Sequence, residues 1–209
     1  MCSLIPTPAR GAKGKVRFTT LIAASQLDPD LNAVPASAGI YFVYIREDAS
    51  LLCSDAPAFW QSETPVRCDG HQLVYLGASG QSVRARVKCH LRGDSRVSSL
   101  RKTLGGLLLR ELCLSPYRSS RTKYHFADGE ERLTEWICRN TAYDFIENPD
   151  AFSLEKFLIQ SLRPPFNITH RRHTPVAKDL MRANWILRGA PLRRSSGRPS
   201  QLSKLHCAS

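Results

Sequence analysis

The sequence has few acidic residues and no long apolar run. Its 209 residues include 18 Asp and Glu against 30 Lys and Arg, which gives a net charge of +12. This excess favours a polyanionic partner, and nucleic acid before a membrane surface because no amphipathic basic anchor is evident. No window approaches ~18 uninterrupted apolar residues, so the sequence excludes a membrane span. Pro6, Pro8 and Gly11 stand where a signal peptide needs its apolar stretch, so we expect a cytoplasmic protein.

Paired cysteines are also absent. The seven cysteines are odd in number and scattered, and none forms a Cys-x-x-Cys pair. This pattern argues against a structural zinc site and favours reduced thiols in a reducing compartment. With 42% hydrophobic and 23% charged residues, the composition is that of one globular domain with appendages.

Charge is unevenly distributed along the chain. Residues 170–209 hold nine Lys or Arg and one acid, and residues 84–102 form a second basic stretch, whereas residues 128–150 are acidic. Segregation of this kind predicts one positively charged face. For the C-terminal extension, the alternative is a solvated tail that only keeps the protein soluble.

Hydrophobic patterns predict a mixed α+β domain. Aromatic and β-branched residues indicate two strands and, before the turn at residues 128–129, a third. Spacings of three and four residues indicate four helices, the last of which is stopped by Pro164 and Pro165. The polar stretch between the first two strands, residues 46–72, has the composition of a long hairpin insertion. The expected strands are 39–45, 73–76 and 123–126, and the expected helices are 83–91, 100–114, 130–142 and 152–162.

Several polar residues lie where a packed core does not need them. Glu155 falls on or beside the apolar stripe of the helix 152–162, where a carboxylate either reaches solvent at the border or is kept for a cation. Arg86 and His90 are four residues apart on one helix and could hold a phosphate between them, although polar edges of an amphipathic helix look the same. Tyr41 and Tyr75 lie in the two predicted strands, where most tyrosines are core aromatics.

Taken in order, these elements resemble the GIY-YIG nuclease family, in particular bacterial stand-alone members with a basic C-terminal extension. Gly39–Tyr41 matches the first motif letter for letter, and Tyr75–Gly77 matches the second with Leu76 in its middle. The family's arginine falls at position 85, where this chain has alanine flanked by Arg84 and Arg86. A one-residue insertion in the preceding loop brings Arg86 into register, and His90 favours this choice. The glutamate helix and the terminal asparagine of the family correspond to Glu155 and Asn167.

The resemblance implies a small three-stranded antiparallel sheet flanked by helices, with the site on one sheet face. It covers the middle of the chain and suggests three parts: an N-terminal extension (1–34), the nuclease domain (35–170) and a basic C-terminal extension (171–209). Within the domain, the hairpin insertion (46–72) and an added helical segment (98–124) depart from the family's compact core.

The implied function is metal-dependent hydrolysis of phosphodiester bonds in DNA, without a small-molecule cofactor. Glu155 would hold one Mg²⁺ or Mn²⁺ ion, Arg86 would stabilise the charge on the phosphoryl oxygens, and Tyr41 would be the general base. For that role the pKa of Tyr41, ordinarily about 10, would have to be lowered by nearby cations. The remaining roles are orientation of the phosphate or water by Tyr75, a supporting base or a phosphate ligand at His90, and orientation of backbone or site groups by Asn167. Further contacts to nucleic acid are expected from Arg84, Lys88, Arg101, Lys102, Arg171 and Arg172.

Two rival functions stay open on the sequence. One is a DNA-binding module that keeps the fold and the positive face but has lost catalysis, which the displaced arginine supports. The other is an RNA-binding structural protein whose motif matches are accidental. The latter predicts that Tyr41, Tyr75, Arg86 and Glu155 do not converge in space.

Overall fold

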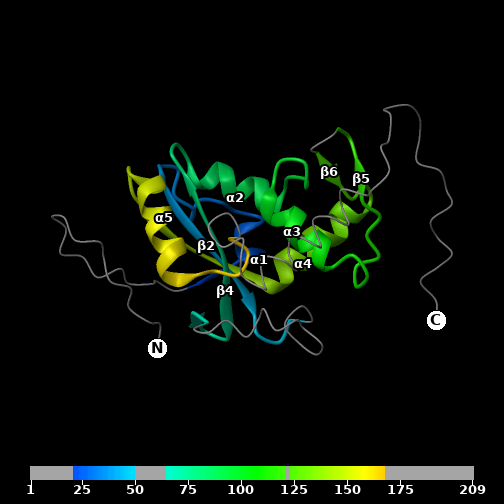
Figure 1. The fold of residues 1–209 in the computed structure, drawn as a ribbon, viewed down its shortest axis with the longest axis horizontal. Coiled ribbons are helices and arrows are strands. Elements are labelled where there is room, and N and C mark those ends of the chain that lie inside the picture. Colours follow the sequence, from blue (N-terminus) through cyan, green and yellow to red (C-terminus); the bar gives the residue numbers. More distant parts are fainter. Residues whose placement is uncertain (1–20, 50–64, 121–122, 168–209) are drawn as a thin grey trace.

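A five-stranded antiparallel sheet forms the centre of the protein (Figure 1). The computed structural model describes residues 21–49, 65–120 and 123–167. The strands lie in the order β1 (Ile22–Ala23), β7 (Thr141–Glu147), β2 (Gly39–Arg46), β4 (His71–Ser79) and β3 (Arg67–Cys68). A separate two-stranded sheet pairs β5 (Tyr117–Arg118) with β6 (Tyr124–His125).

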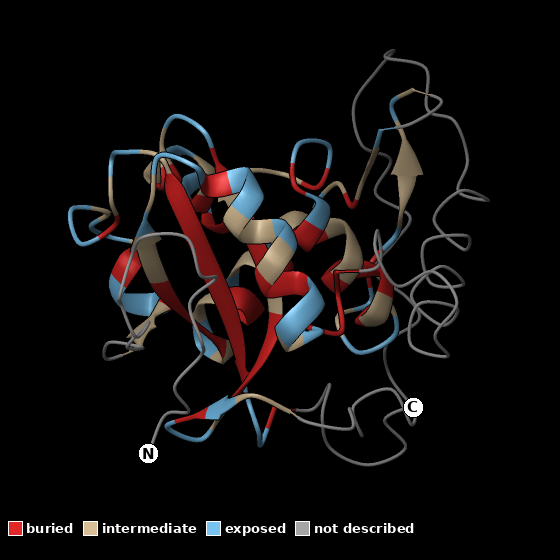
Figure 2. Cartoon of the chain, turned by 60° about the vertical axis from the view of Figure 1, so that its left-hand side comes forward, coloured by how far each residue is buried: buried red, intermediate tan, exposed pale blue. Residues whose placement is uncertain are grey.

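Strand β2 is the middle of the sheet, and every residue from Gly39 to Ile45 is buried (Figure 2). Because successive side chains of a strand point to opposite faces, Tyr41, Val43 and Ile45 enter one core while Ile40, Phe42 and Tyr44 enter the other. Both faces of β2 are therefore buried against other elements, which explains its unbroken apolar and aromatic composition.

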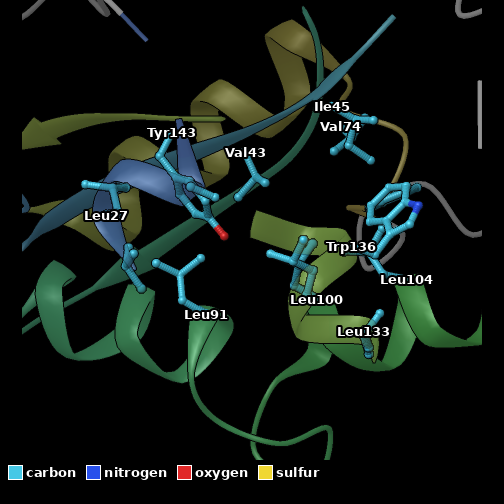
Figure 3. Close-up of a cluster of buried hydrophobic side chains, with 14 of the residues drawn as sticks. Leu27, Val43, Ile45, Val74, Leu91, Leu100, Leu104, Leu133, Trp136 and Tyr143 are labelled. Atoms are coloured by element: carbon cyan, nitrogen blue, oxygen red, sulfur yellow. The ribbon is translucent and has the colours of Figure 1, made fainter. Parts of the chain in front are cut away.

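Helices cover the two faces unequally. On the Tyr41 face lie α1 (Ala24–Leu27), α2 (Val83–Leu91), α3 (Ser99–Leu107) and α4 (Gly129–Asn140), and on the opposite face lies α5 (Ala151–Leu162). Figure 3 shows the larger core, in which Val43 and Val74 of the sheet face leucines of the helices. Helix α5 ends at Leu162 because Arg163 adopts a left-handed conformation with φ of 51° and Pro164 cannot continue a helix.

The predicted α+β architecture and antiparallel sheet are confirmed, but the expected number of three strands was too low. The short strands β1 and β3 add an edge on each side of the central three. The third predicted strand, 123–126, is also misplaced, because β6 pairs with β5 outside the main sheet. The strand that pairs with β2 is β7, and its acidic surroundings concealed it in the sequence.

The predicted helices agree with the structure in part. The helix 83–91 agrees with α2, whereas the helix expected over 100–114 ends at Leu107.

Most of the predicted hairpin insertion lies outside the described residues, although Arg46 pairs with His71 across its base. Strand β1 and helix α1 fall in the range assigned to the N-terminal extension, and both pack on the main domain. No helix of the described residues has the length and hydropathy of a membrane span.

The expectation of reduced thiols throughout was wrong at one position. Cys68 takes part in a disulfide bond. Cys89, Cys113 and Cys138 are free thiols, as the scattered cysteine pattern predicted.

Candidate active site

Tyr41 lies in the middle of the sheet, where strand β4 makes room for its ring. Its register partner on β4 is Gly77. A Cβ atom at Gly77 would collide with the hydroxyl oxygen and ring of Tyr41. Only glycine fits there, so the last residue of Tyr75–Gly77 creates the space that the tyrosine of Gly39–Tyr41 occupies.

Tyr75 lies on the same face of the sheet as Tyr41, because it pairs with Val43, two residues beyond Tyr41 on β2. A β-bulge follows, since Tyr44 pairs with Leu73, and the extra residue Val74 also packs in the larger core. The ring centroids of Tyr75 and Tyr41 are 6.1 Å apart.

Helix α2 brings a histidine to the two tyrosines. The helix begins after Ser82, whose hydroxyl accepts a hydrogen bond from the backbone N–H of Ala85. Two turns later His90 is completely buried, with its Nε2 2.8 Å from the Tyr41 hydroxyl oxygen and its Nδ1 2.7 Å from Ser98 Oγ. Both ring nitrogens of His90 therefore have partners inside the protein.

Arg86 adds a positive charge beside this pair. One turn before His90 on α2, it lowers the pKa of both Tyr41 and His90, although burial is the largest influence on each. Arg86 and Tyr75 are half-buried, whereas Tyr41 is 1% exposed and His90 0%. A ligand from solvent therefore meets Arg86 and Tyr75 before the buried pair.

Tyr41, Tyr75, Arg86 and His90 form a polar cluster beside an otherwise apolar core. A comparison with known protein families identifies the family of the chain. A model of the GIY-YIG catalytic domain matches residues 39–184, which is more than half of the chain. The chain belongs to the GIY-YIG family. No curated protein and no solved structure matches it. Because GIY-YIG domains are generally endonucleases, the family implies a nuclease-type function in general terms.

The charge states in this GIY-YIG site differ from the sequence expectation. Burial and the neighbouring Tyr75 raise the pKa of Tyr41 well above its ordinary value, and Arg86 only partly offsets them. Burial, Arg86 and Arg101 lower the pKa of His90 to about 3. In the free protein at neutral pH, Tyr41 is therefore a phenol and His90 a neutral imidazole. The expectation that nearby cations lower the pKa of Tyr41 is wrong for the free protein, because desolvation outweighs Arg86.

A neutral buried histidine predicts loss of stability in acid. The unfolded chain binds this proton near pH 6.5, whereas the folded chain binds it only near pH 3, so the free energy of unfolding falls as the pH drops through that window. From pH 7 to pH 4 we expect His90 to account for a loss of roughly 3 kcal/mol. Urea unfolding of wild type and His90→Gln at both pH values measures it. Equal losses in the two proteins would contradict this origin.

The two candidate arginines have different surroundings. Arg84 donates hydrogen bonds from its guanidinium to the backbone oxygens of Val34 (2.9 Å) and Asn32 (3.3 Å), in the segment before β2. The charge of Arg86 instead lowers the pKa of both Tyr41 and His90. Of the two arginines, Arg86 is therefore the one beside Tyr41 and His90.

Asn167 contacts the backbone of β4 rather than a side chain of the cluster. Its Nδ2 donates to the carbonyl oxygen of Leu76 (2.7 Å), and its Oδ1 accepts from the N–H of the same residue (2.8 Å). The amide thus replaces a neighbouring strand between Tyr75 and Gly77, and it holds this part of β4 in place.

Glu155 lies on α5, which packs on the face of the sheet opposite to Tyr41, so the structure does not place this helix on the one sheet face that the resemblance implied for the site. On this helix it is four residues from Ala151 and Ile159 and three from Leu158, so it shares the face of these buried residues and is itself half-buried. Helix α5 packs on β4, the strand that carries Tyr75. Among the described residues no three His, Cys, Asp or Glu side chains cluster as metal ligands. A single carboxylate still fits Mg²⁺, which usually takes one or two carboxylates and completes its shell with water and substrate phosphates.

The basic residues that we expected to contact DNA differ in their exposure to solvent. Lys88 is exposed and Lys102 is half-buried, with its pKa lowered by burial. Arg101 was expected to contact nucleic acid, and this was wrong: its side chain is 0% exposed and forms an ion pair with Glu130 at 2.8 Å. Arg171 and Arg172 lie outside the described residues.

The sequence did not indicate two serines that lie next to the cluster. Ser98 Oγ is 2.7 Å from His90 Nδ1, and Ser99 Oγ is 3.4 Å from the Tyr75 hydroxyl. The available signal was the serine pair in front of an apolar-periodic run, which is typical of a helix N-terminus.

Proposed function

We propose that this protein is a metal-dependent endonuclease that hydrolyses phosphodiester bonds in DNA with Tyr41, Tyr75, Arg86, His90 and Glu155. The observation that carries the proposal is the hydrogen bond of 2.8 Å between Tyr41 and His90, beside Arg86. A phenol, a proton acceptor and a guanidinium are the groups that phosphodiester hydrolysis needs for general base catalysis and for charge stabilisation.

Arg86 prepares the site for the substrate phosphate. A guanidinium binds two phosphate oxygens at once, and its N–H groups stabilise the charge that develops on them. When a phosphate pairs with Arg86, the guanidinium charge acts less on both groups, so the pKa of His90 rises and that of Tyr41 rises with it. In the proposed reaction, His90 Nε2 at 2.8 Å is the acceptor for the Tyr41 proton.

The phenolate of Tyr41 then removes a proton from the attacking water. The water oxygen forms the new bond to phosphorus, the bond to the leaving oxygen breaks, and that oxygen takes a proton from solvent. The proton on His90 finally leaves to solvent, and the pair returns to its neutral state. Tyr75, whose hydroxyl lies at the exposed side of the pair, orients the phosphate or the water.

Glu155 would hold one Mg²⁺ or Mn²⁺ ion, which would supply electrostatic stabilisation of the phosphate and of the leaving oxygen. The positive charge of the chain, +12 overall, favours DNA as the polyanion. Lys88 on the outer side of α2 and Lys102 on α3 are the described basic residues we assign to backbone phosphates, with Arg171 and Arg172 beyond them in the chain.

Cleavage of DNA tests the function directly. Purified full-length protein is incubated with supercoiled plasmid and with branched DNA, in Mg²⁺ or Mn²⁺ and in EDTA. Nicking that requires the metal supports the proposal. Salt-sensitive binding without cleavage in either metal would instead identify a DNA-binding module, and preferential binding of RNA would favour the structural role.

The two arginines form a matched pair for a second test. Arg86→Ala is expected to lower the rate of plasmid nicking by about 100-fold, because it removes a charge stabiliser of the transition state. Arg84→Ala is expected to keep the rate within a few-fold, because its guanidinium contacts the backbone near Val34. Thermal unfolding of both variants separates activity from stability. A larger loss in Arg84→Ala would exchange the roles of the two residues.

A further inference from the structure

Phe152 is a large apolar side chain that the fold leaves in solvent. It is the second residue of α5 and is 63% exposed, and among the described residues only Val97, at 56%, is a comparable exposed apolar side chain. Burial of a phenylalanine side chain ordinarily stabilises a protein, so packing does not account for an aromatic ring at this position. Single exposed apolar residues are common on protein surfaces, however, and the position of Phe152 rather than its exposure alone must indicate a role.

The ring of Phe152 lies against the loop that connects β4 to α2. A Cβ atom at Gly80 would come within 2.9 Å of the Phe152 ring, so the ring packs on the bare backbone of this glycine. Ser79 fixes the loop, because its Oγ accepts from the backbone N–H groups of Ser82 (2.9 Å) and Gln81 (3.3 Å). The first turn of α5 therefore meets the loop that begins α2, although the two helices cover opposite faces of the sheet.

This contact joins the two halves of the candidate site. Glu155 is three residues after Phe152 on α5, and side chains at this spacing are neighbours on a helix surface. Arg86 lies in the first turn of α2, and Gly80 precedes that helix by three residues. A phosphate bound by Arg86 and by a cation at Glu155 would therefore bring its nucleotide close to the exposed ring.

An exposed lysine follows the ring along α5. Lys156 is four residues after Phe152, so the two side chains lie on one face of the helix. The lysine offers a point charge that suits a backbone phosphate, whereas the phenyl ring offers a flat surface without hydrogen-bonding groups. An aromatic ring next to a cation is typical of surfaces that bind single-stranded nucleic acid, where bases stack on the ring and phosphates pair with the charge.

We propose that Phe152 stacks on an unpaired nucleobase next to the scissile phosphate, and that the substrate is therefore DNA with an open base at a nick, a branch or a single-stranded end. In an intact duplex each base face is covered by its neighbours, so the ring has no partner there. The inference rests on the proposed function for the place of the scissile phosphate, but the stacking contact itself does not depend on cleavage.

Photochemical crosslinking detects the stacked base without a cleavage assay. 5-Iodouracil, which crosslinks to aromatic rings that stack on it, is placed at the unpaired positions of a branched oligonucleotide. The full-length protein is irradiated with this DNA in EDTA, at concentrations where a gel shift shows the complex. We expect a crosslink at Phe152, identified by mass spectrometry of the peptide, and none when the iodouracil lies in the middle of an intact duplex. Crosslinks that all lie elsewhere in the protein would overturn the proposal.

Substitutions at Phe152 separate stacking from apolar contact. Phe152→Ala is expected to weaken binding of branched DNA about tenfold and to leave binding of an intact duplex nearly unchanged. Phe152→Trp should keep the affinity for branched DNA, whereas Phe152→Leu, which keeps an apolar contact with Gly80 but has no aromatic ring, should lose most of it. Val97→Ala is the control, because it removes the other exposed apolar side chain, and it should bind both DNAs as wild type does. Equal losses for the two DNAs in Phe152→Ala, or wild-type affinity in Phe152→Leu, would contradict stacking.

Cleavage rates connect the contact to the reaction. With an active wild type, Phe152→Ala should raise KM for branched DNA about tenfold with kcat nearly unchanged, because the ring binds the substrate and takes no part in the chemistry. An unchanged KM would overturn the proposal. Failure of wild type to cleave DNA in either metal would instead overturn the proposed function, while the crosslink and the affinities would still decide whether Phe152 stacks on a base.

Discussion

Replacement of Tyr41 by phenylalanine is expected to lower the rate of DNA cleavage by about 1,000-fold. Among the described residues, the phenol is the only group hydrogen-bonded to His90 Nε2, at 2.8 Å, so the variant removes the base and leaves its proton acceptor without a partner. The ring remains in the space over Gly77, so the fold and the affinity for DNA should change little. Single-turnover cleavage and a gel-shift titration at fixed salt measure the two effects separately.

Tyr44 offers a control on the same strand. It is three residues farther along β2, faces the opposite core and is 0% exposed. In the part of the chain that the structure describes, its buried hydroxyl has no hydrogen-bond partner. Tyr44→Phe therefore removes an unsatisfied polar group and should leave both stability and cleavage at or above the wild-type level. Equal losses in Tyr41→Phe and Tyr44→Phe would mean that the sheet was damaged and that Tyr41 has no chemical role.

The sequence predicted the central strand and one helix of the candidate site, but not the whole sheet. Strand β2 and helix α2 were predictable because an aromatic, β-branched run and a helical spacing of apolar residues are local signals. Strand β7 was missed because its acidic surroundings resemble a surface segment, and only its pairing with β2 makes it a central strand. Local composition does not contain that long-range information.

The same limit applies to the charged residues. Arg101 stands beside Lys102 and reads as a solvated basic pair, but its guanidinium is buried because Glu130, 29 residues later, satisfies it. The choice between Arg84 and Arg86 depends on the length of one loop, and only the structure shows that Arg84 contacts backbone oxygens in the segment before β2. In both cases the partner is distant in sequence, so no spacing rule could predict it.

The charge states of Tyr41 and His90 follow from burial, which the sequence also did not reveal. A pair with a high pKa on the donor and a low pKa on the acceptor holds its proton on Tyr41 in the free protein. The free protein is thus a poor base, and the proposed reaction requires the bound substrate and cation to favour the phenolate.

Glu155 occupies a position that packing alone does not favour. It shares a helix face with Ala151, Leu158 and Ile159, which are buried at 4% exposure or less. A leucine or alanine there would pack at no electrostatic cost, whereas a half-buried carboxylate is costly to desolvate. In the proposed reaction this carboxylate would be a ligand of a hard divalent cation, whose remaining ligands would come from water and from the substrate phosphate.

Glu155→Gln is accordingly expected to lower metal-dependent cleavage by about 1,000-fold or more, because the variant keeps the side-chain size but loses the charge that holds the ion. DNA affinity should stay equal or rise, since a negative charge is removed near a polyanion. Glu131→Gln, an exposed carboxylate on α4, is the control and should cleave as wild type does. Cleavage is measured over a range of Mg²⁺ and Mn²⁺ concentrations, with circular dichroism to show that both variants fold. Full activity of Glu155→Gln at low metal concentration would remove this glutamate from the site and leave the cation to other ligands.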